Sequence, residues 1–521
     1  MTIHSTRSVT QTALADRSVQ VDGGSIAGIV DEAASCIAFR GIPYAASPLG
    51  ALRWRPPQPV VAWDGVRIAD TFAPMCAQPA RPDGSIFLEY AGQQATSEDC
   101  LYLNVFAPLD AHADAAVNLA KLPVMVWIHG GAFQVGSGTN ATFVQGDLHT
   151  RGVILVTLNY RVNAFGFLTH PALTDESEHA ASGNYGLMDQ IAALKWVRRN
   201  IAVFGGDPQS VTVFGQSAGG ASIANLMASP LATGLFDRAI VQSVAFMPMM
   251  PRAEAEQQGI DFMARAGVAT LAELRALPAA DIVNVSKGTR PMMWPSVDGW
   301  VMPESVDTVF AAGRQMPVPM LAGWTRDEGS VFPCYPDAAT FKAALAKRFG
   351  GSAARALSHY PADTDDQASD SGRRINGDAL AAAGVWKAAC AHATRTDAPV
   401  YLYHFEHPQP FSDDQAYAEA APAEKLGVFH SAEYPYVFGT LHALTRPWTE
   451  GDHRLVALMQ QYWIHFAKTG TPNGPGLTSW SRFSGNDEQT MHLDEVPYMG
   501  AIPRLDAIRF LVESGLIGDF L

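Results

Sequence analysis

The chain has few of the residues that mark several common classes of protein. Only five of its 521 residues are cysteine. Five are too few for a scaffold built on disulfides, and their spacings match no zinc-ligand pattern. Cysteine usage therefore predicts no metal centre, and at least one thiol stays unpaired. The five are Cys36, Cys76, Cys100, Cys334 and Cys390.

Positive charge and long apolar runs are also scarce. Lysine and arginine number 36 against 51 aspartates and glutamates, which gives a formal net charge of −15. A diffuse negative field opposes binding to phosphate backbones and to anionic membrane surfaces. No apolar run approaches the roughly 20 residues needed to cross a bilayer. We therefore expect neither nucleic acid nor a membrane as a partner.

The first twenty residues contain no apolar run of the kind found at the centre of a signal peptide. This favours a cytoplasmic location and leaves a secreted or periplasmic one open. We expect residues 1–18 to form a disordered N-terminal tail and residues 19–521 to form a single domain. Composition does not choose between a monomer and a homodimer.

What the chain does have is apolar residues in a regular rhythm. Hydrophobic residues make up 48% of the sequence, so a large core is available. Short β-branched runs alternate with helix-like stretches, a pattern typical of βαβ units around a parallel sheet. The fold class is therefore α/β. The runs that carry this prediction are strands at 124–128, 153–158 and 211–214 and a helix at 188–200.

Helical spacing dominates the next part of the chain. Between residues 250 and 397 the composition shifts toward Ala, Arg and Glu, with helices expected at 253–266 and 270–277. We expect this region to form a helical cap over the sheet. The strand pattern returns at 400–405, and a closing amphipathic helix is predicted at 454–469, just before Gly470.

The clearest chemical motif is a serine between small residues. Ser217 follows an apolar strand and precedes a small-residue helix, within the run Gly215-Gln216-Ser217-Ala218-Gly219. A serine at a tight strand-to-helix turn is exposed, and the helix N-terminus points free amides at it. Ser217 is therefore the predicted nucleophile of an acyl-transfer reaction.

A second motif supplies partners for the oxygen that becomes negative in such a reaction. His129-Gly130-Gly131-Ala132-Phe133 follows the strand at 124–128. Residues without side chains let backbone amides approach an oxygen closely. We expect Gly130, Gly131 and Ala218 to form the oxyanion hole, and His129 to shape the loop rather than act as a base.

Many further segments make the chain similar to the type-B carboxylesterase family. The resemblance covers nearly the whole chain and implies an α/β-hydrolase fold, with a mostly parallel sheet flanked by helices. It also implies cleavage of small-molecule esters through an acyl-enzyme, without a metal or cofactor. The matching segments are Phe39 to Ala45, Ser97 to Val105, Asn159 to Phe167, Gly183 to Gln190, Phe204 to Pro208 and Phe466 to Asn473.

The resemblance also implies the other two members of a catalytic triad. Its acid is a glutamate, which corresponds to Glu328, with adjacent Asp327 as the alternative. Its base corresponds to His430 in the segment Gly427 to Glu433, and the order Ser, Glu, His is the one this fold requires. The alternative bases are His404, His407 and His442.

Structural pairs are implied in the same way. Arg53 with Glu98 and Arg161 with Asp189 correspond to ion pairs of the family, and we interpret both as structural. Cys76 and Cys100 correspond to a family disulfide. The redox state of these two thiols stays open, because a chain without a visible secretion signal often keeps them reduced.

The site departs from the family pattern at two positions. Gln216 stands where relatives carry a glutamate, so cationic substrates lose a partner, and Val244 stands where relatives carry a glycine. We expect an apolar substrate pocket that accepts small to medium neutral esters. Two alternatives remain open: an amide or carbamate hydrolase with the same triad, and a non-catalytic adhesion module. The pocket residues expected are Phe133, Gln216, Val244, Met292, Met293 and Trp294.

Overall fold

The computed structural model describes residues 18–31, 35–92, 94–109, 121–287, 289, 292–332 and 335–518. Of the predicted N-terminal tail, residues 1–17 lie outside the described residues, while Ser18 begins the first strand. Cys334 also lies outside them. Within the described chain, no helix combines the length and the apolar composition that crossing a membrane requires.

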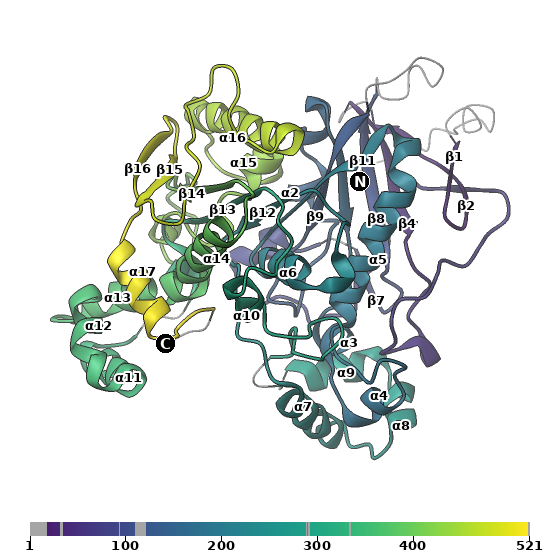
Figure 1. Ribbon diagram of the computed structural model, residues 1–521, viewed down its shortest axis with the longest axis horizontal. Helices are drawn as coiled ribbons and strands as arrows, with labels where there is room; N and C mark the ends of the chain where they lie inside the picture. The colour runs from purple at the N-terminus through teal and green to yellow at the C-terminus, as the bar shows by residue number, and fades with distance from the viewer. Residues whose placement is uncertain are drawn as a thin grey trace.

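A long mixed sheet runs through the centre of the molecule (Figure 1). From the second to the eighth strand in the order below, all neighbouring strands pair in parallel. The strands at both edges pair antiparallel. The order is β16 (Tyr498–Ala501), β15 (Gln489–Leu493), β14 (Val400–Phe405), β13 (Met320–Thr325), β12 (Arg238–Gln242), β11 (Gly206–Gln216), β9 (Leu122–Ile128), β10 (Ile154–Leu158), β8 (Tyr102–Pro108), β4 (Cys36–Pro43) and β3 (Ile29–Asp31).

Two small sheets lie outside the central one. One consists of β1 (Ser18–Val21), β2 (Gly24–Ala27) and β5 (Val66–Ile68), and the other of β6 (Met75–Cys76) and β7 (Thr96–Ser97).

Side-chain alternation along the strands builds a separate hydrophobic core on each face of the sheet. In β9, Val124, Val126 and Ile128 belong to one core, while Met125 and Trp127 belong to the other. Successive side chains of a strand point to opposite faces, so a run that is apolar at every position must be covered on both. Because β9 is covered on both faces, its sequence is a continuous apolar run.

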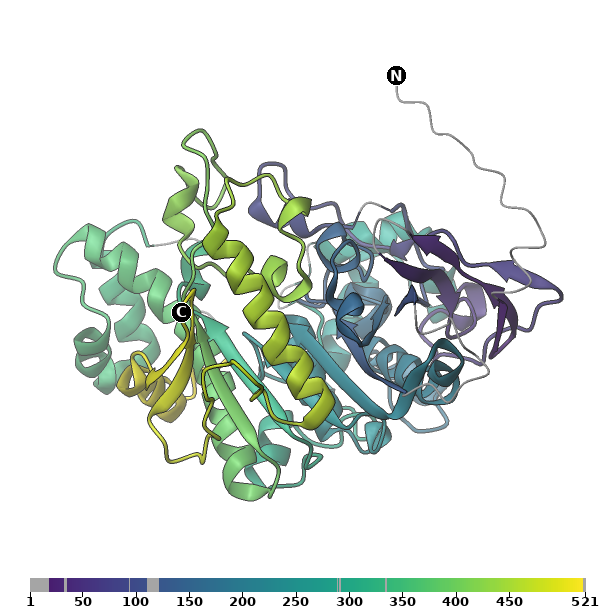
Figure 2. The same cartoon turned by 90° about the horizontal axis from the view of Figure 1, so that it is seen from above.

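Helices cover both faces (Figures 1 and 2). The first core is closed by α5 (Tyr185–Asn200), α6 (Ala218–Ala228), α10 (Val306–Ala311) and α14 (Ala383–Arg395). The second is closed by α2 (Ala141–Val144), α15 (Tyr434–Phe438) and α16 (Glu450–Thr469). The chain is therefore an α/β-hydrolase fold of three layers.

The region expected to form the cap is divided. β13 belongs to the central sheet, and α10 and α14 pack on its face, so residues 250–397 do not form one continuous cap. The helices before and after β13 form two groups at different places (Figure 1). The first contains α7 (Arg252–Arg265), α8 (Leu271–Ala276) and α9 (Ala279–Lys287), near α3 (Asn163–Phe167) and α4 (Pro171–Asp175); the second contains α11 (Ala338–Phe349), α12 (Ala353–His359) and α13 (Asp365–Gly377), near α17 (Leu505–Glu513).

Candidate active site

Ser217 occupies a strained turn between β11 and α6. Its φ of 58° and ψ of −127° lie in a region that L residues rarely adopt. The close packing around it explains the small residues on either side. A Cβ on Gly219 would lie 2.1 Å from the carbonyl oxygen of Ile128, and one on Gly215 would lie 2.7 Å from the same oxygen. Only glycines let the turn press against the end of β9.

The glycine loop after β9 lies directly against Ser217. A Cβ on Gly130 would be 3.1 Å from the Cβ of Ser217, and Gly131 has a φ of 115° that other residues avoid. Within the described chain, the amides of Gly130 and Gly131 donate to no other group. The amide of Ala218 opens α6 and has no intrahelical acceptor. These three amides are thus available to an oxygen on the reacting carbon.

His430 and Glu328 meet at the ends of neighbouring loops. Nδ1 of His430 forms a short hydrogen bond with Oε2 of Glu328, and both side chains are buried. The other carboxylate oxygen accepts from the amide of Thr325 at 2.8 Å, which fixes the carboxylate. Because Nδ1 contacts Glu328, Nε2 is the ring nitrogen that could exchange a proton with another group, and Nε2 of Gln216 lies 3.3 Å from it. Ser217 and His430 line the same cavity, without a direct hydrogen bond between their side chains in the described structure.

The alternative acid points elsewhere. The carboxylate of Asp327 accepts from the amide of Val428 at 2.9 Å and pairs with Arg326 at 2.9 Å. Among the described residues, Asp327 forms no hydrogen bond or ion pair with the His430 ring. Glu328, and not Asp327, is therefore the carboxylate that contacts the imidazole.

The alternative bases are also remote from the serine. His404 contacts Glu406, and His407 lies between Asp452 and Asp494. His442 is exposed. None of the three histidines lines the cavity that holds Ser217.

The cavity around Ser217 has a volume of about 450 Å³ and a largely apolar wall. This size suits a small to medium organic molecule. Gln216, Val244, Met292 and Trp294 line it, as expected from the sequence. Its other lining residues with larger apolar or aromatic side chains are Phe87, Tyr90, Val135, Phe143, Met247, Phe332, Leu380 and Tyr434.

Two residues expected in the pocket do not line it. Phe133 is fully buried, and its ring packs edge-on against Phe167 with the centroids 5.1 Å apart. Met293 is also buried and contributes to the core on the first face of the sheet. Met292 and Trp294, on either side of Met293 in the chain, line the cavity, while Met293 lies in the core.

Gln216 is held in one orientation beside the base. Its Oε1 accepts from the hydroxyl of Tyr434 at 2.6 Å and from Ser431 at 3.2 Å, and its Nε2 donates to Ser243 at 3.2 Å. The same Nε2 lies 3.3 Å from both ring nitrogens of His430. A neutral amide therefore faces the imidazole where the family pattern has a carboxylate.

A second buried carboxyl group, which the sequence did not single out, lies behind the triad. Glu433 accepts hydrogen bonds from Nε2 of Gln242 at 2.9 Å and from the hydroxyl of Tyr403 at 2.8 Å. Burial, with a smaller contribution from the negative charge of Glu328, raises the pKa of Glu433 to about 8. Burial therefore favours the neutral form of Glu433. Its position three residues after His430 was the only available hint.

His129 has the structural place expected of it. Its Nδ1 lies 2.8 Å from the carbonyl oxygen of Gly130, and its ring stacks on Tyr160 with the centroids 4.3 Å apart. Burial lowers the pKa of His129 to about 4. A histidine held neutral in this way carries no charge at neutral pH, and its remaining ring proton on Nδ1 can be donated to the carbonyl oxygen of Gly130.

The two expected ion pairs are present; Arg161 with Asp189 is buried, and Arg53 with Glu98 is partly buried. Arg53 contacts Glu98 through Nε at 2.6 Å, and Arg161 contacts Asp189 at 2.7 and 2.8 Å. Neither pair lines the cavity that holds Ser217.

The cysteines expected as a possible disulfide are free thiols. Cys76 and Cys100 are both buried, and a hydrogen bond with Cys76 together with burial raises the pKa of Cys100. Cys36 and Cys390 are also free.

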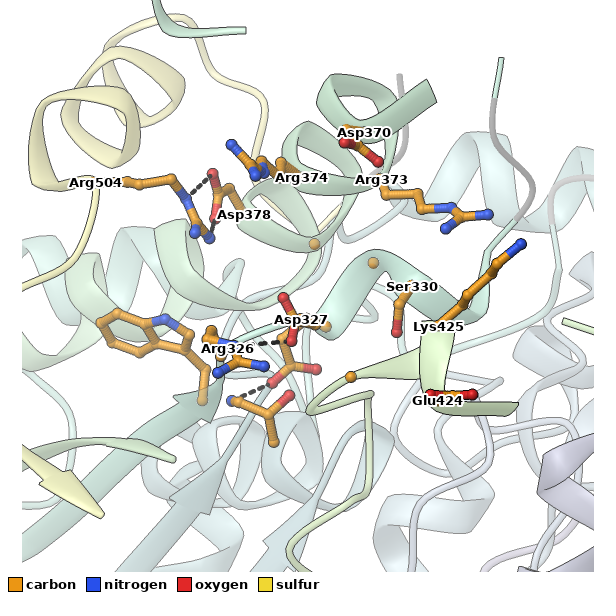
Figure 3. Close-up of a pocket in the computed structure, with 16 residues that line it drawn as sticks. Arg326, Asp327, Ser330, Asp370, Arg373, Arg374, Asp378, Glu424, Lys425 and Arg504 are labelled. Atoms are coloured by element: carbon orange, nitrogen blue, oxygen red, sulfur yellow. Dashed lines mark hydrogen bonds and ion pairs between the residues drawn. The ribbon is translucent and has the colours of Figure 1, made fainter. Parts of the chain in front are cut away.

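A second cavity, of about 190 Å³, adjoins the segment that carries Glu328 (Figure 3). Its wall is strongly charged, and its ion pairs include Arg326 with Asp327 and Arg504 with Asp378. It contains neither Ser217 nor His430. It is therefore not the cavity in which acyl transfer would take place.

Three residues at the carboxyl ends of β14 and β15 could hold a metal ion. His404, Glu406 and His492 bring their ligand atoms within 4.8 Å of one another. Hydrogen bonds already account for the short distances between these three side chains, because Oε1 of Glu406 lies 3.0 Å from Nδ1 of His404 and 2.8 Å from Nδ1 of His492. These three residues do not line the cavity of Ser217, so they take no direct part in acyl transfer there.

Comparison with known proteins agrees with the sequence resemblance. A sequence model of the carboxylesterase family matches residues 15–510. The para-nitrobenzyl esterase of Bacillus subtilis is 37% identical over 88% of this chain and 91% of its own. The fumonisin B1 esterase of Sphingopyxis macrogoltabida is 35% identical over 86% of this chain and 82% of its own. Among solved structures, a PNB esterase superposes with a TM-score of 0.81, at 34% identity over 95% of this chain and 99% of the other.

Proposed function

Because the chain belongs to the carboxylesterase family and is a carboxylic ester hydrolase, we propose that Ser217, Glu328 and His430 are its catalytic triad. Gly130, Gly131 and Ala218 form the oxyanion hole. The substrates proposed are small to medium neutral esters, bound in the apolar cavity of about 450 Å³.

In the proposed reaction, each of these groups has one role. His430 takes the hydroxyl proton of Ser217 as the oxygen attacks the ester carbonyl, and Glu328 stabilises the imidazolium that forms. The three free amides bind the developing oxyanion. The imidazolium then protonates the leaving alcohol. Water, deprotonated by the same imidazole, cleaves the acyl-enzyme and restores the serine.

One observation carries the proposal: the buried contact between Glu328 and His430 next to a serine in a strained turn. The contact sets the tautomer of the ring, so that the nitrogen turned away from Glu328 is the one that can accept a proton. The turn exposes the hydroxyl in the same cavity. Neither arrangement is needed for a stable core.

Hydrolysis of a neutral aryl ester by the wild type and by Ser217→Ala, Glu328→Gln and His430→Ala tests the triad. We expect Ser217→Ala and His430→Ala to lower kcat by about a thousandfold or more, and Glu328→Gln to lower it strongly as well. A phosphonate that labels the wild type should add no mass to Ser217→Ala. Wild-type turnover by any of the three variants would remove that residue from the mechanism.

We also propose that the enzyme works in the cytoplasm, as a monomer or a homodimer. The four free thiols among the described residues support a reducing compartment. Cell fractionation and the mass in solution test these two points.

A further inference from the structure

One side chain in the cavity of Ser217 carries a permanent positive charge. Arg81 lies in the loop between β6 and the short helix Ile86–Tyr90, and it lines the same cavity as Ser217 and His430. No aspartate or glutamate is among the described residues that line this cavity. The wall is otherwise mostly apolar, so the guanidinium is an exception in it.

Arg81 has no counter-charge in the described chain. It forms neither an ion pair nor a hydrogen bond there, and its guanidinium lies over the ring of Phe87, 5.8 Å from the centroid. Burial lowers the pKa of Arg81, which reflects the loss of water around it. An arginine remains charged even so. A partly desolvated cation without a partner is costly, and an anionic ligand would offset that cost.

Two glutamates at the short helix that follows this loop are already engaged. Glu89 pairs with Arg446 and accepts from Tyr417. Glu419 accepts from the hydroxyl of Ser85 and from the amide of Ile86. Both acids therefore satisfy other donors, and neither is a partner of Arg81.

The charge of Arg81 acts on the wall that carries the oxyanion loop. After burial, the Arg81 charge is a further cause that lowers the pKa of His129, the residue before Gly130. It also opposes the rise that burial causes in the pKa of Tyr434. The hydroxyl of Tyr434 would be 3.5 Å from a Cβ on Gly130 and bonds to Gln216. Arg81 thus stands beside the groups that surround the reacting carbonyl.

We propose that Arg81 binds a carboxylate carried by the substrate, so that esters with a negative group away from the reacting carbonyl are preferred over neutral esters of the same shape. This rests on the proposed function and extends its substrate class from neutral to monoanionic esters. Gln216 supports the same preference, because it leaves no negative charge next to the serine to repel such a substrate.

Two matched pairs of esters test the proposal and locate the carboxylate. In 4-carboxybenzyl acetate and 4-carbamoylbenzyl acetate, the charge or its neutral replacement is on the alcohol. In monobenzyl succinate and benzyl succinamate, it is on the acyl group. The measured quantity is the ratio of kcat/KM for the anionic ester to that for its neutral partner. It is compared among the wild type, Arg81→Gln, Arg81→Lys, Arg482→Gln and Ser217→Ala.

We expect Arg81→Gln to lower this ratio about ten- to a hundredfold in one of the two pairs, as the loss of a charged hydrogen bond does. The change should appear mainly in KM and should shrink at high salt. Arg81→Lys should restore part of the ratio. Arg482, which is exposed and does not line the cavity, provides the control for loss of one positive charge, and Arg482→Gln should keep the wild-type ratio.

The outcomes separate the two proposals. Turnover of the neutral esters shows that each Arg81 variant is folded and active. If Ser217→Ala loses both esters of a pair but Arg81→Gln keeps the wild-type ratio in both pairs, the role of Arg81 is wrong and the triad stands. If Ser217→Ala hydrolyses the esters like the wild type, the proposed function itself fails.

Discussion

The amide of Gln216 faces the ring of His430, with Nε2 3.3 Å from each ring nitrogen. The hydroxyls of Tyr434 and Ser431 donate to the amide oxygen and hold that orientation. The same hydroxyls would serve a carboxylate equally well. The site can therefore accept a glutamate in place of Gln216 without being rebuilt, which separates the effect of charge from that of shape.

Gln216→Glu should move the acid limb of the pH profile of kcat/KM to higher pH, by about half a unit to one unit. A carboxylate next to the imidazole stabilises its protonated form, which cannot act as the base. Hydrolysis of a choline ester should improve several-fold relative to a neutral ester of the same size. The control is Gln209→Glu, which adds the same charge at an exposed position near the other end of β11. Equal pH profiles for the two variants would contradict the prediction.

Gly130→Ala should lower kcat by about a hundred- to a thousandfold, as the loss of an oxyanion-hole donor does. The new Cβ would lie 2.6 Å from the carbonyl oxygen of Gln216, so the loop must move away from Ser217. Gly351→Ala is the control, because a Cβ there meets nothing within 4 Å. Single-turnover kinetics with an aryl ester measure the acylation step. An unchanged acylation rate in Gly130→Ala would remove this amide from the oxyanion hole.

The sequence predicted the elements that repeat a pattern and missed those that do not. The strand predicted at 400–405 is β14, residue for residue. The helix predicted from residue 454 begins at Glu450, because Thr449 and Asp452 cap its first turn with reciprocal hydrogen bonds. That turn is polar and does not show the apolar spacing by which the helix was predicted.

The residues of the site also differ in how far the sequence could predict them. Ser217 is defined by its own neighbours, so a short motif was enough to predict it. Glu328 and His430 stand 102 positions apart in the chain, and the fold alone brings them together, so only the resemblance to a family predicted them. Arg81 lies in an irregular loop without periodicity, and its importance comes from a cavity and a missing counter-charge. Neither the cavity nor the missing counter-charge can be predicted from the sequence.

Asp189→Asn should lower the free energy of unfolding by about 3–5 kcal/mol, because it leaves the buried guanidinium of Arg161 without its counter-charge. The exposed pair of Arg199 and Asp22 offers a matched control. Asp22→Asn should cost less than about 1 kcal/mol. Urea denaturation of both variants measures the difference. Similar losses for the two would mean that the buried pair is no more important than a surface pair.

Glu433→Gln should flatten the dependence of stability on pH between about 5 and 8. In the folded protein the pKa of Glu433 is raised to about 8, against an ordinary value near 4.5. Between these values the unfolded chain has lost the proton while the folded protein keeps it, so wild-type stability falls as pH rises. The loss is on the order of a few kcal/mol across the window and ends near pH 8.

The glutamine variant isolates this one titration. Every other ionisable group is the same in both proteins, so the difference between their free energies of unfolding at pH 5.5, 6.5, 7.5 and 8.5 reports Glu433 alone. The hydroxyl of Tyr403 can turn to accept from the new amide, which keeps the buried hydrogen bonds paired. Glu178 is exposed, and for Glu178→Gln the same difference should stay flat across this range. If the difference for Glu433→Gln is equally flat, Glu433 is ionised in the folded protein, and the charge beside Glu328 must then be stabilised by its two hydrogen bonds.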